Sequence, residues 1–298
     1  MIFLSVVTPQ GAQLAVKTAS GILVLAEARA RFPEVGLPLP QTLDSVLAEP
    51  SGLERVRSYV ATLLSGPEGL EGLMRPEEEV HIGLLFRPRN IICQGRNYAA
   101  HVEEGGNKPP GRPMLFAKLS GCVIGPHEPI LLPLDSAEVD YEAELAVVLG
   151  RTCRRVPAED ALDYVAGYTC LNDVSARDFQ RSDGQWLRAK SQDTFAPIGP
   201  YLVSREEIPD PQDLASRCWV NGEVRQDSNT RWMIFPVREL IAYISRGITL
   251  EPGDVISTGT PHGIGAAMKP PRFLKDGDEV VVEVERVGRL VNTVRKSA

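Results

Sequence analysis

The pattern of hydrophobic and polar positions divides the chain near residue 75. Residues 12–30, AQLAVKTASGILVLAEARA, predict two strands on either side of a turn at Ser20–Gly21. Residues 51–66 predict an amphipathic helix, because one face at helical spacing is apolar: Leu53, Val56, Val60, Leu63 and Leu64. A charged connector, RPEEEV, follows. We therefore predict a small N-terminal α+β domain over residues 1–75.

Residues 76–298 are rich in predicted strands. Short apolar stretches are separated by Gly and Pro in RNIICQG, PMLFAK, YEAELAVVLG, VAGYTCLND, GPYLVS, CWVNGEV, GDVISTGT and DEVVVEVERVGRLVNTV. The clearest helix in this part is VRELIAYISRG, which Gly247 ends. Many short strands broken in this way predict a mainly β, α+β class with a closed or sandwiched sheet architecture.

Three acids alternate with apolar residues in VDYEAELAVVLG, residues 139–150. A period of two predicts a strand in which Asp140, Glu142 and Glu144 share a face, with neighbours about 7 Å apart. Acids in this pattern usually mark a solvated face. In this strand the opposite face is apolar, and the acidic face also becomes apolar from Ala146 onward. The pattern therefore favours acids at the rim of a cavity.

Glu142 and Glu144 at that spacing would repel each other by about 2 kcal/mol at an effective dielectric constant near 20. Partial burial would add to this cost. A divalent cation would offset both, and oxygen ligands favour Mg²⁺, Mn²⁺ or Ca²⁺ over zinc. Asp140, nearest the start of the strand, is interpreted as an acid behind the ligands or in solvent.

A second acidic position ends the apolar stretch VAGYTCLND at Asp173. The following residues SARDFQ turn toward a helix on which Arg177 and Gln180 have a similar orientation. The pattern alone favours Asp173 as a helix cap with Arg177 as its surface partner. The alternative is that Asp173 lies in the same site as Glu142 and Glu144.

Two further clusters carry candidate chemistry. His101 and Glu104 are three residues apart in GRNYAAHVEEGG, so on a helical turn they would face each other, as in a proton-transfer pair or a surface ion pair. The segment STGTPHGIG follows a predicted strand but matches neither a phosphate loop nor a dinucleotide fingerprint. Thr260 in this segment is either an oxyanion contact or part of a turn.

Composition narrows the function classes. A net charge of −7 and a pI near 5.3 argue against a nucleic-acid surface. The apolar opening MIFLSVV is short and has no preceding positive charge, so we expect no signal peptide and no membrane span. Five scattered cysteines without a C-x-x-C pair indicate reduced thiols. These features predict a cytoplasmic protein.

Seven motifs occur in the order found in one enzyme family: GRNYAAHVEEGG, PMLFAKLSGCVIGP, VDYEAELAVVLG, AGYTCLNDVSARDFQ, QWLRAKSQDTFAPIGP, VNGEVRQDSNT and GDVISTGTPHGIG. From about Arg89 to the C-terminus the chain resembles the fumarylacetoacetate hydrolase family. Within that family it most resembles the branch of fumarylacetoacetate hydrolase domain-containing protein 2 and its bacterial relatives. The resemblance implies a mixed β-sandwich roll over residues 76–298, a homodimer, and a Mg²⁺ or Mn²⁺ cofactor.

The resemblance also implies roles for individual residues. Glu142, Glu144 and Asp173 would be the metal ligands, and His101 and Glu104 would move protons or activate water. The remaining implied residues contact or shape the substrate site: Lys190, Thr260, Arg177, Gln180 and Lys118. Without the resemblance, Lys190 and Lys118 would be interpreted as solvated lysines. Relatives that cleave fumarylacetoacetate itself supply a further Asp from the loop matching GRNYAAH, where this sequence has no acid before Glu103.

That difference favours a small 2-oxo acid substrate. The predicted function is metal-dependent C–C bond hydrolysis of an acylpyruvate-type substrate through an enolate that the metal stabilises. The same enolate serves two alternatives, an oxaloacetate decarboxylase or tautomerase and a 2-hydroxyhepta-2,4-diene-1,7-dioate isomerase. A 2-oxo acid binding protein without turnover is a further alternative, although it would not need His101 and Glu104.

Overall fold

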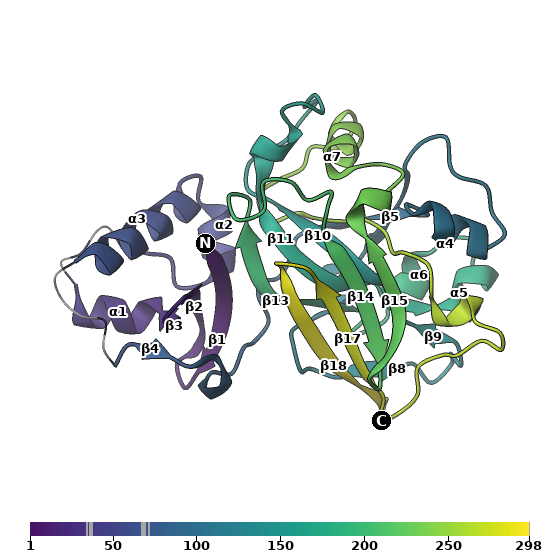
Figure 1. Cartoon of the computed structure of the whole chain (residues 1–298), viewed down its shortest axis with the longest axis horizontal. Helices are drawn as coiled ribbons and strands as arrows, with labels where there is room; N and C mark the ends of the chain where they lie inside the picture. Colours follow the sequence, from purple (N-terminus) through teal and green to yellow (C-terminus); the bar gives the residue numbers. More distant parts are fainter. Residues whose placement is uncertain (34, 36–37, 67–69, 71, 298) are drawn as a thin grey trace.

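Strands dominate the computed structural model, which describes residues 1–33, 35, 38–66, 70 and 72–297 (Figure 1). The strands are β1 (Ile2–Thr8), β2 (Gly11–Thr18), β3 (Gly21–Val24), β4 (Met74–Arg75), β5 (Ile91–Gly95), β6 (Met114–Lys118), β7 (Val123–Ile124), β8 (Ile130–Leu132), β9 (Val139–Asp140), β10 (Ala143–Leu149), β11 (Val165–Asn172), β12 (Ser175–Ala176), β13 (Ala196–Ser204), β14 (Ala215–Val220), β15 (Glu223–Asn229), β16 (Val255–Ser257), β17 (Glu279–Val284) and β18 (Gly288–Lys296).

The helices are short and lie between the strands or at their ends. The α-helices are α1 (Leu25–Arg31), α2 (Leu43–Ala48), α3 (Gly52–Ser65), α4 (Ala99–Glu104), α5 (Arg177–Ser182), α6 (Leu187–Lys190) and α7 (Val237–Ser245). Single 3₁₀ turns are η1 (Glu77–Glu79), η2 (Ser120–Cys122), η3 (Ala161–Tyr164), η4 (Thr230–Trp232) and η5 (Gly265–Ala267). Within the part of the chain that the structure describes, no helix is long and apolar enough to cross a membrane.

Two sheets form the layers of the fold. The larger sheet runs in the order β4-β3-β2-β1-β13-β11-β10-β16-β5-β6, and the smaller in the order β15-β14-β17-β18-β8. Strands β14, β17 and β18 pack across β10, β11 and β13, as Figure 1 shows. This arrangement confirms the predicted mainly β, α+β class and its mixed sandwich architecture.

The N-terminal segment adds strands to the larger sheet. Strand β1 pairs antiparallel with β13, with Ile2 opposite Val203, so β1 to β4 continue the sheet to its edge. Helices α1 and α3 pack beside these strands (Figure 1). The predicted second strand ends at Val24, and the following LAEARA forms helix α1. The boundary at residue 75 coincides with the end of β4 and stays a prediction.

Strand β10 lies in the middle of the larger sheet, between β11 and β16, and all of its residues are buried. Its apolar side chains are buried on both faces of the larger sheet. Burying each Val or Leu contributes about 1.5–3 kcal/mol to the stability of the fold. This confirms that the strand is buried on both faces beyond Glu144. The firmly packed portion of β10 therefore fixes the position of the acids at its beginning.

Candidate active site

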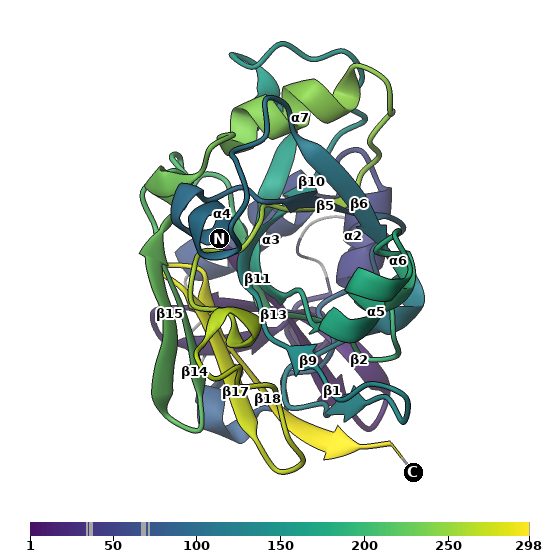
Figure 2. The same cartoon turned by 90° about the vertical axis from the view of Figure 1, so that its right-hand side faces the viewer.

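A cavity of about 340 Å³ lies between helix α4 and the helices α5 and α6. These three helices lie on the side of the molecule that faces the viewer in Figure 2. The end of β5, strand β6, the beginning of β10 and the loop after β16 supply further lining residues. Helical and loop side chains thus meet above the ends of buried strands, where rigid backbone can position polar groups.

The structure brings the three predicted metal ligands together. Glu142 precedes β10, Glu144 lies within it, and Asp173 follows the neighbouring strand β11. The backbone N–H of Asp173 donates to the Glu142 carbonyl at 2.9 Å, which joins the two strand ends. One carboxylate oxygen from each residue lies within 4.8 Å of the others, and all three residues are buried. The interpretation of Asp173 as a cap on a surface helix was wrong.

The three carboxylates differ in their partners. Lys190 Nζ lies 2.7 Å from both Glu142 Oε2 and Asp173 Oδ2. Glu144 instead accepts hydrogen bonds from Ser257 Oγ at 2.5 Å and from Gly259 N at 2.8 Å. Among the described residues, no Lys, Arg or His nitrogen lies within ion-pair distance of Glu144.

These partners shift the pKa values of the two glutamates in opposite directions. Burial raises the pKa of Glu142, but the charges of Lys190 and Arg177 outweigh it and hold that pKa well below its usual range. Burial, followed by the charges of Asp173 and Glu142, raises the pKa of Glu144 well above its usual range. Glu144 is therefore the carboxylate whose charge the protein alone leaves unbalanced.

A divalent cation fits this arrangement. Glu142, Glu144 and Asp173 offer hard carboxylate oxygens with no Cys or His among them, which suits Mg²⁺ or Mn²⁺. The buried, unbalanced carboxylate of Glu144 is the feature that such an ion would satisfy. These three residues would hold the ion, and its identity stays a prediction.

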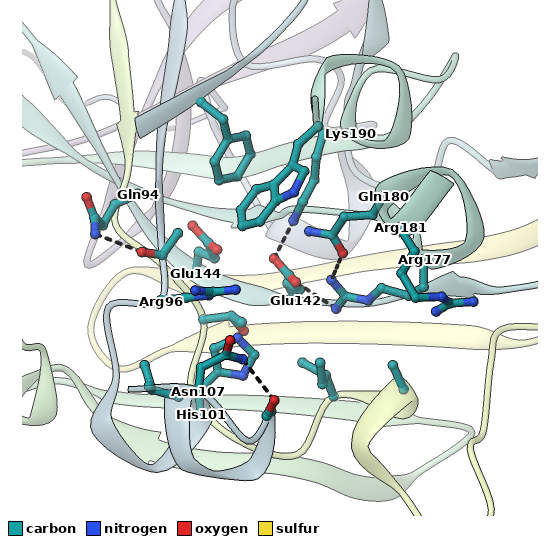
Figure 3. Close-up of a pocket in the computed structure, with 18 residues that line it drawn as sticks. Gln94, Arg96, His101, Asn107, Glu142, Glu144, Arg177, Gln180, Arg181 and Lys190 are labelled. Atoms are coloured by element: carbon teal, nitrogen blue, oxygen red, sulfur yellow. Dashed lines mark hydrogen bonds and ion pairs between the residues drawn. The ribbon is translucent and has the colours of Figure 1, made fainter. Parts of the chain in front are cut away.

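Arg177 connects the ligands to the helix α5. Its guanidinium lies 2.6 Å from Glu142 Oε1, donates from Nε to Asp140 Oδ2 at 2.9 Å, and donates to Gln180 Oε1 at 3.0 Å. Arg177 is only 6% exposed, so its interpretation as a surface residue was wrong. Figure 3 shows Arg177 and Gln180 together on the wall beside Glu142.

Asp140 lies behind this wall and is fully buried, which corrects the alternative that placed it in solvent. It belongs to β9, Glu142 lies between the strands and Glu144 lies in β10, so the prediction that the three acids share one strand was wrong. Its carboxylate accepts from the backbone N–H groups of Gly265 at 2.8 Å and Ala266 at 3.1 Å, besides Arg177. Asp140 therefore holds Arg177 in place.

The two lysines have different positions. Lys190 lines the cavity at the end of α6 and is 1% exposed. Burial lowers the pKa of Lys190, but Asp173 and Glu142 outweigh it and raise that pKa above its usual value. Lys118 lies behind Asp173, with Nζ 2.6 Å from Asp173 Oδ1, and is not among the lining residues. Both are buried, so neither is a solvated lysine.

His101 lines the opposite wall, and Glu104 is its partner on the same helix. His101 Nδ1 lies 2.8 Å from Glu104 Oε1, and the backbone N–H of Gly263 donates to Glu104 Oε2 at 2.9 Å. The side chains are 16% and 20% exposed. Because the carboxylate holds Nδ1, Nε2 is the ring nitrogen left for proton transfer. Figure 3 shows His101 on the opposite side of the cavity from Glu142.

Thr260 lines the cavity, but its hydroxyl already has partners in the protein. Its Oγ1 accepts from Gln226 Nε2 at 2.8 Å and donates to the Ala143 carbonyl at 3.2 Å. Sequence analysis did not identify Gln226, whose Oε1 also accepts from Ala143 N at 2.9 Å. Ser257 was missed as well. Both lie in ordinary strand patterns that carry no local signal of a site.

Comparisons with known proteins agree with the geometry. A family model, "Fumarylacetoacetate (FAA) hydrolase C-terminal", matches residues 90–295. The protein named oxaloacetate tautomerase Fahd2a, mitochondrial, from Rattus norvegicus is 49% identical over 211 residues, which are 70% of this chain and 67% of that protein.

Two solved structures are similar over the whole chain. Fumarylacetoacetate hydrolase (EaFAH) from Exiguobacterium antarcticum has a TM-score of 0.82 and 36% identity, covering 100% of both chains. The 2-hydroxyhepta-2,4-diene-1,7-dioate isomerase from Mycobacterium marinum has a TM-score of 0.73 and 33% identity, covering 100% of this chain and 99% of that one. These similarities confirm the resemblance that the motifs indicated, and the chain belongs to the fumarylacetoacetate hydrolase family.

Proposed function

We propose that the chain is a divalent-metal-dependent enzyme that interconverts the enol and keto forms of oxaloacetate, with decarboxylation of the same substrate as a related activity. The observation that carries the proposal is one cavity lined on one side by Glu142 and Glu144, two members of a buried carboxylate triad, and on the other by His101, which is paired with Glu104. The rat relative named an oxaloacetate tautomerase supports the choice of substrate. This choice replaces acylpyruvate hydrolysis as the first candidate.

The metal ligands would be Glu142, Glu144 and Asp173. A bound divalent ion supplies Lewis-acid polarisation of the 2-oxo group and offsets negative charge on its oxygen. Lys190, held at 2.7 Å from two of these carboxylates, adds a fixed positive charge to the cavity wall beside the substrate. Lys118 positions Asp173 from behind and would not contact the substrate.

Proton transfer is the task of the opposite wall. His101 takes a proton from the carbon next to the 2-oxo group, or returns one to it, through Nε2. Glu104 fixes the ring through Nδ1 and stabilises the imidazolium while the proton is held. The Gly263 N–H keeps Glu104 in position. Arg177, Gln180 and the Thr260 segment shape the cavity around the substrate's oxygen atoms.

C–C bond hydrolysis of an acylpyruvate is the second candidate. The full-length similarity to the Exiguobacterium hydrolase favours it, and the same pair could activate water instead of moving a proton. Isomerisation of 2-hydroxyhepta-2,4-diene-1,7-dioate would use the same proton transfer, as the Mycobacterium relative's name indicates. All three reactions act on a small 2-oxo acid.

The test begins with protein freed of metal by a chelator. Mg²⁺ or Mn²⁺ is added, and the enol absorbance of oxaloacetate is followed while a coupled assay measures pyruvate. Loss of enol without pyruvate identifies the tautomerase, and pyruvate formation identifies the decarboxylase. Acetylpyruvate and fumarylpyruvate test hydrolysis in the same way. No metal-dependent change with any of these compounds would contradict the proposal.

A matched pair of histidine variants tests the role of the dyad. His101→Ala removes the proposed proton carrier and should reduce turnover by about 10²- to 10⁴-fold. His81→Ala removes an exposed histidine that does not line the cavity, so turnover should be unchanged. Full turnover by His101→Ala would exclude this residue as the proton carrier.

The assembly and cellular location stay predictions. We propose a homodimer, which size-exclusion chromatography with light scattering would measure. The rat relative is named as mitochondrial, so the predicted cytoplasmic location needs an independent test by cell fractionation.

A further inference from the structure

The cavity contains one cation to which neither the motifs nor the proposed mechanism give a task. Arg96 follows strand β5 and lines the cavity. Figure 3 shows its guanidinium inside the cavity, between Glu144 and His101 in that view. A guanidinium at this position is charged at every pH at which the protein folds.

Arg96 differs from the other cations around the cavity in having no carboxylate partner. Lys190 and Arg177 each lie within 2.9 Å of buried carboxylates, and Arg181 at the rim lies 2.6 Å from Glu138. Arg96 makes no ion pair and no side-chain hydrogen bond with any residue that the structure describes. Its donors are therefore available to a bound molecule.

The backbone holds Arg96 in an unfavourable conformation. Its φ is 59°, in the left-handed region, which costs an ordinary L residue free energy. The next residue over-determines this conformation: Asn97 Nδ2 donates to the Thr258 carbonyl at 2.6 Å and to the Phe235 carbonyl at 3.1 Å, and Asn97 Oδ1 accepts from Phe235 N at 2.8 Å. The side chain is thus directed by a rigid turn.

The cavity offers a substrate two kinds of contact. The triad and Lys190 serve the 2-oxo acid group, and Arg96 adds, in the same 340 Å³, a positive charge that no described residue pairs. The planar fork of a guanidinium matches a carboxylate with two parallel hydrogen bonds.

We propose that Arg96 binds a second carboxylate of the substrate, distal to the 2-oxo acid group. This inference rests on the proposed function and narrows its substrate class to 2-oxo dicarboxylic acids. A compact four-carbon dicarboxylate fits a cavity of this size. A neutral or apolar group in the same position would leave the guanidinium without a partner, so the cavity discriminates against monocarboxylates.

The experiment uses two pairs of compounds that differ only in the distal charge. The first is oxaloacetate and its 4-methyl ester, compared by kcat/KM in the metal-loaded protein. The second is malate and its 4-methyl ester, compared by calorimetric binding. Three variants accompany the wild type: Arg96→Gln removes the charge, Arg96→Lys keeps the charge without the fork, and Arg181→Gln removes a paired charge at the rim.

The wild type should bind malate at least about 10-fold more tightly than its ester, and kcat/KM should show the same preference. Arg96→Gln should weaken malate binding about 10- to 100-fold and ester binding less than about 3-fold. Arg96→Lys should keep part of the preference, and Arg181→Gln should keep all of it. Metal affinity should not fall in Arg96→Gln.

Three results would overturn the inference. The wild type could show no preference for the dicarboxylates, Arg96→Gln could weaken both members of a pair equally, or Arg181→Gln could abolish the preference as fully as Arg96→Gln. A wild type that turns over neither substrate but still prefers malate, through Arg96, would refute the proposed function and support the distal subsite. Turnover of both substrates with no effect of Arg96→Gln would support the proposed function and refute the distal subsite.

Discussion

Replacing Glu144 by Gln should stabilise the metal-free protein while abolishing metal binding. Glu144 is 2% exposed, and one of its oxygens lies within 4.8 Å of oxygens from Glu142 and Asp173. Two like charges at that distance repel by about 3 kcal/mol at an effective dielectric constant near 20. Gln keeps an acceptor for Ser257 Oγ and Gly259 N but removes the charge.

Proton binding limits the size of this effect. The pKa of Glu144 is raised in the folded protein, so protonation of the carboxyl can relieve the repulsion. Each pH unit between its ordinary pKa of 4.5 and the solution pH then costs 1.36 kcal/mol. The upper bound near pH 7 is about 3 kcal/mol. We expect Glu144→Gln to gain about 1–3 kcal/mol there, or roughly 2–6 °C in Tm.

The pH dependence has a definite sign. A group whose pKa is raised on folding contributes stability that is complete below its unfolded pKa and is lost as the pH rises through the folded pKa. The metal-free wild type should therefore lose stability relative to Glu144→Gln as the pH rises above about 4.5.

Denaturation of chelator-treated protein across this range, with and without Mg²⁺, measures both effects. Mg²⁺ should raise the Tm of the wild type and leave that of Glu144→Gln unchanged. A variant that is no more stable than the metal-free wild type, or that keeps the Mg²⁺ shift, would refute the reasoning.

Three further predictions concern the neighbours of the triad. Metal binding should release protons, because the pKa of Glu144 is raised without metal and the ion favours its ionised form; calorimetry in buffers of different ionisation enthalpy measures the release. Asp140→Asn should lower kcat about 10- to 100-fold with metal affinity nearly unchanged, because Asp140 holds Arg177 at 2.9 Å and is no ligand; steady-state kinetics and metal titration separate the two. Gly259→Ala should destabilise the protein by about 2 kcal/mol or more in urea denaturation, because φ is +98° and a Cβ would lie 2.6 Å from the Cβ of Asn97.

Local patterns were sufficient for the strands and for much of the site. Alternation predicted the strand through Glu144, and the apolar stretch ending at Asp173 predicted β11. Spacing predicted that His101 and Glu104 would meet on a helix, and they lie 2.8 Å apart on α4. Such features depend on residues close in sequence, where the geometry of a strand or a helix decides which side chains are neighbours.

The pairing of distant residues could not be predicted from the residues alone. Lys118 and Lys190 approach Asp173 from separate elements, 55 and 17 residues away in sequence. Only the packing of β6 and α6 around the end of β11 buries them. The hydrophobic pattern also set the N-terminal segment apart from the rest of the chain. No local signal shows that β1 pairs with β13, some 200 residues later.

Glu142 and Glu144 illustrate what the structure adds to an alternating pattern. In the sequence they are equivalent acids two positions apart. In the structure Glu142 has Lys190 at 2.7 Å and an Arg177 nitrogen at 2.6 Å, whereas the donors to Glu144 from the described part of the chain are neutral. Glu142→Gln should therefore destabilise the metal-free protein by about 3–5 kcal/mol, because it deprives buried cations of a partner. The same substitution two residues later should stabilise it. Denaturation of both variants without metal tests whether charge pairing, rather than burial, decides the sign; changes of the same sign would show that burial decides it.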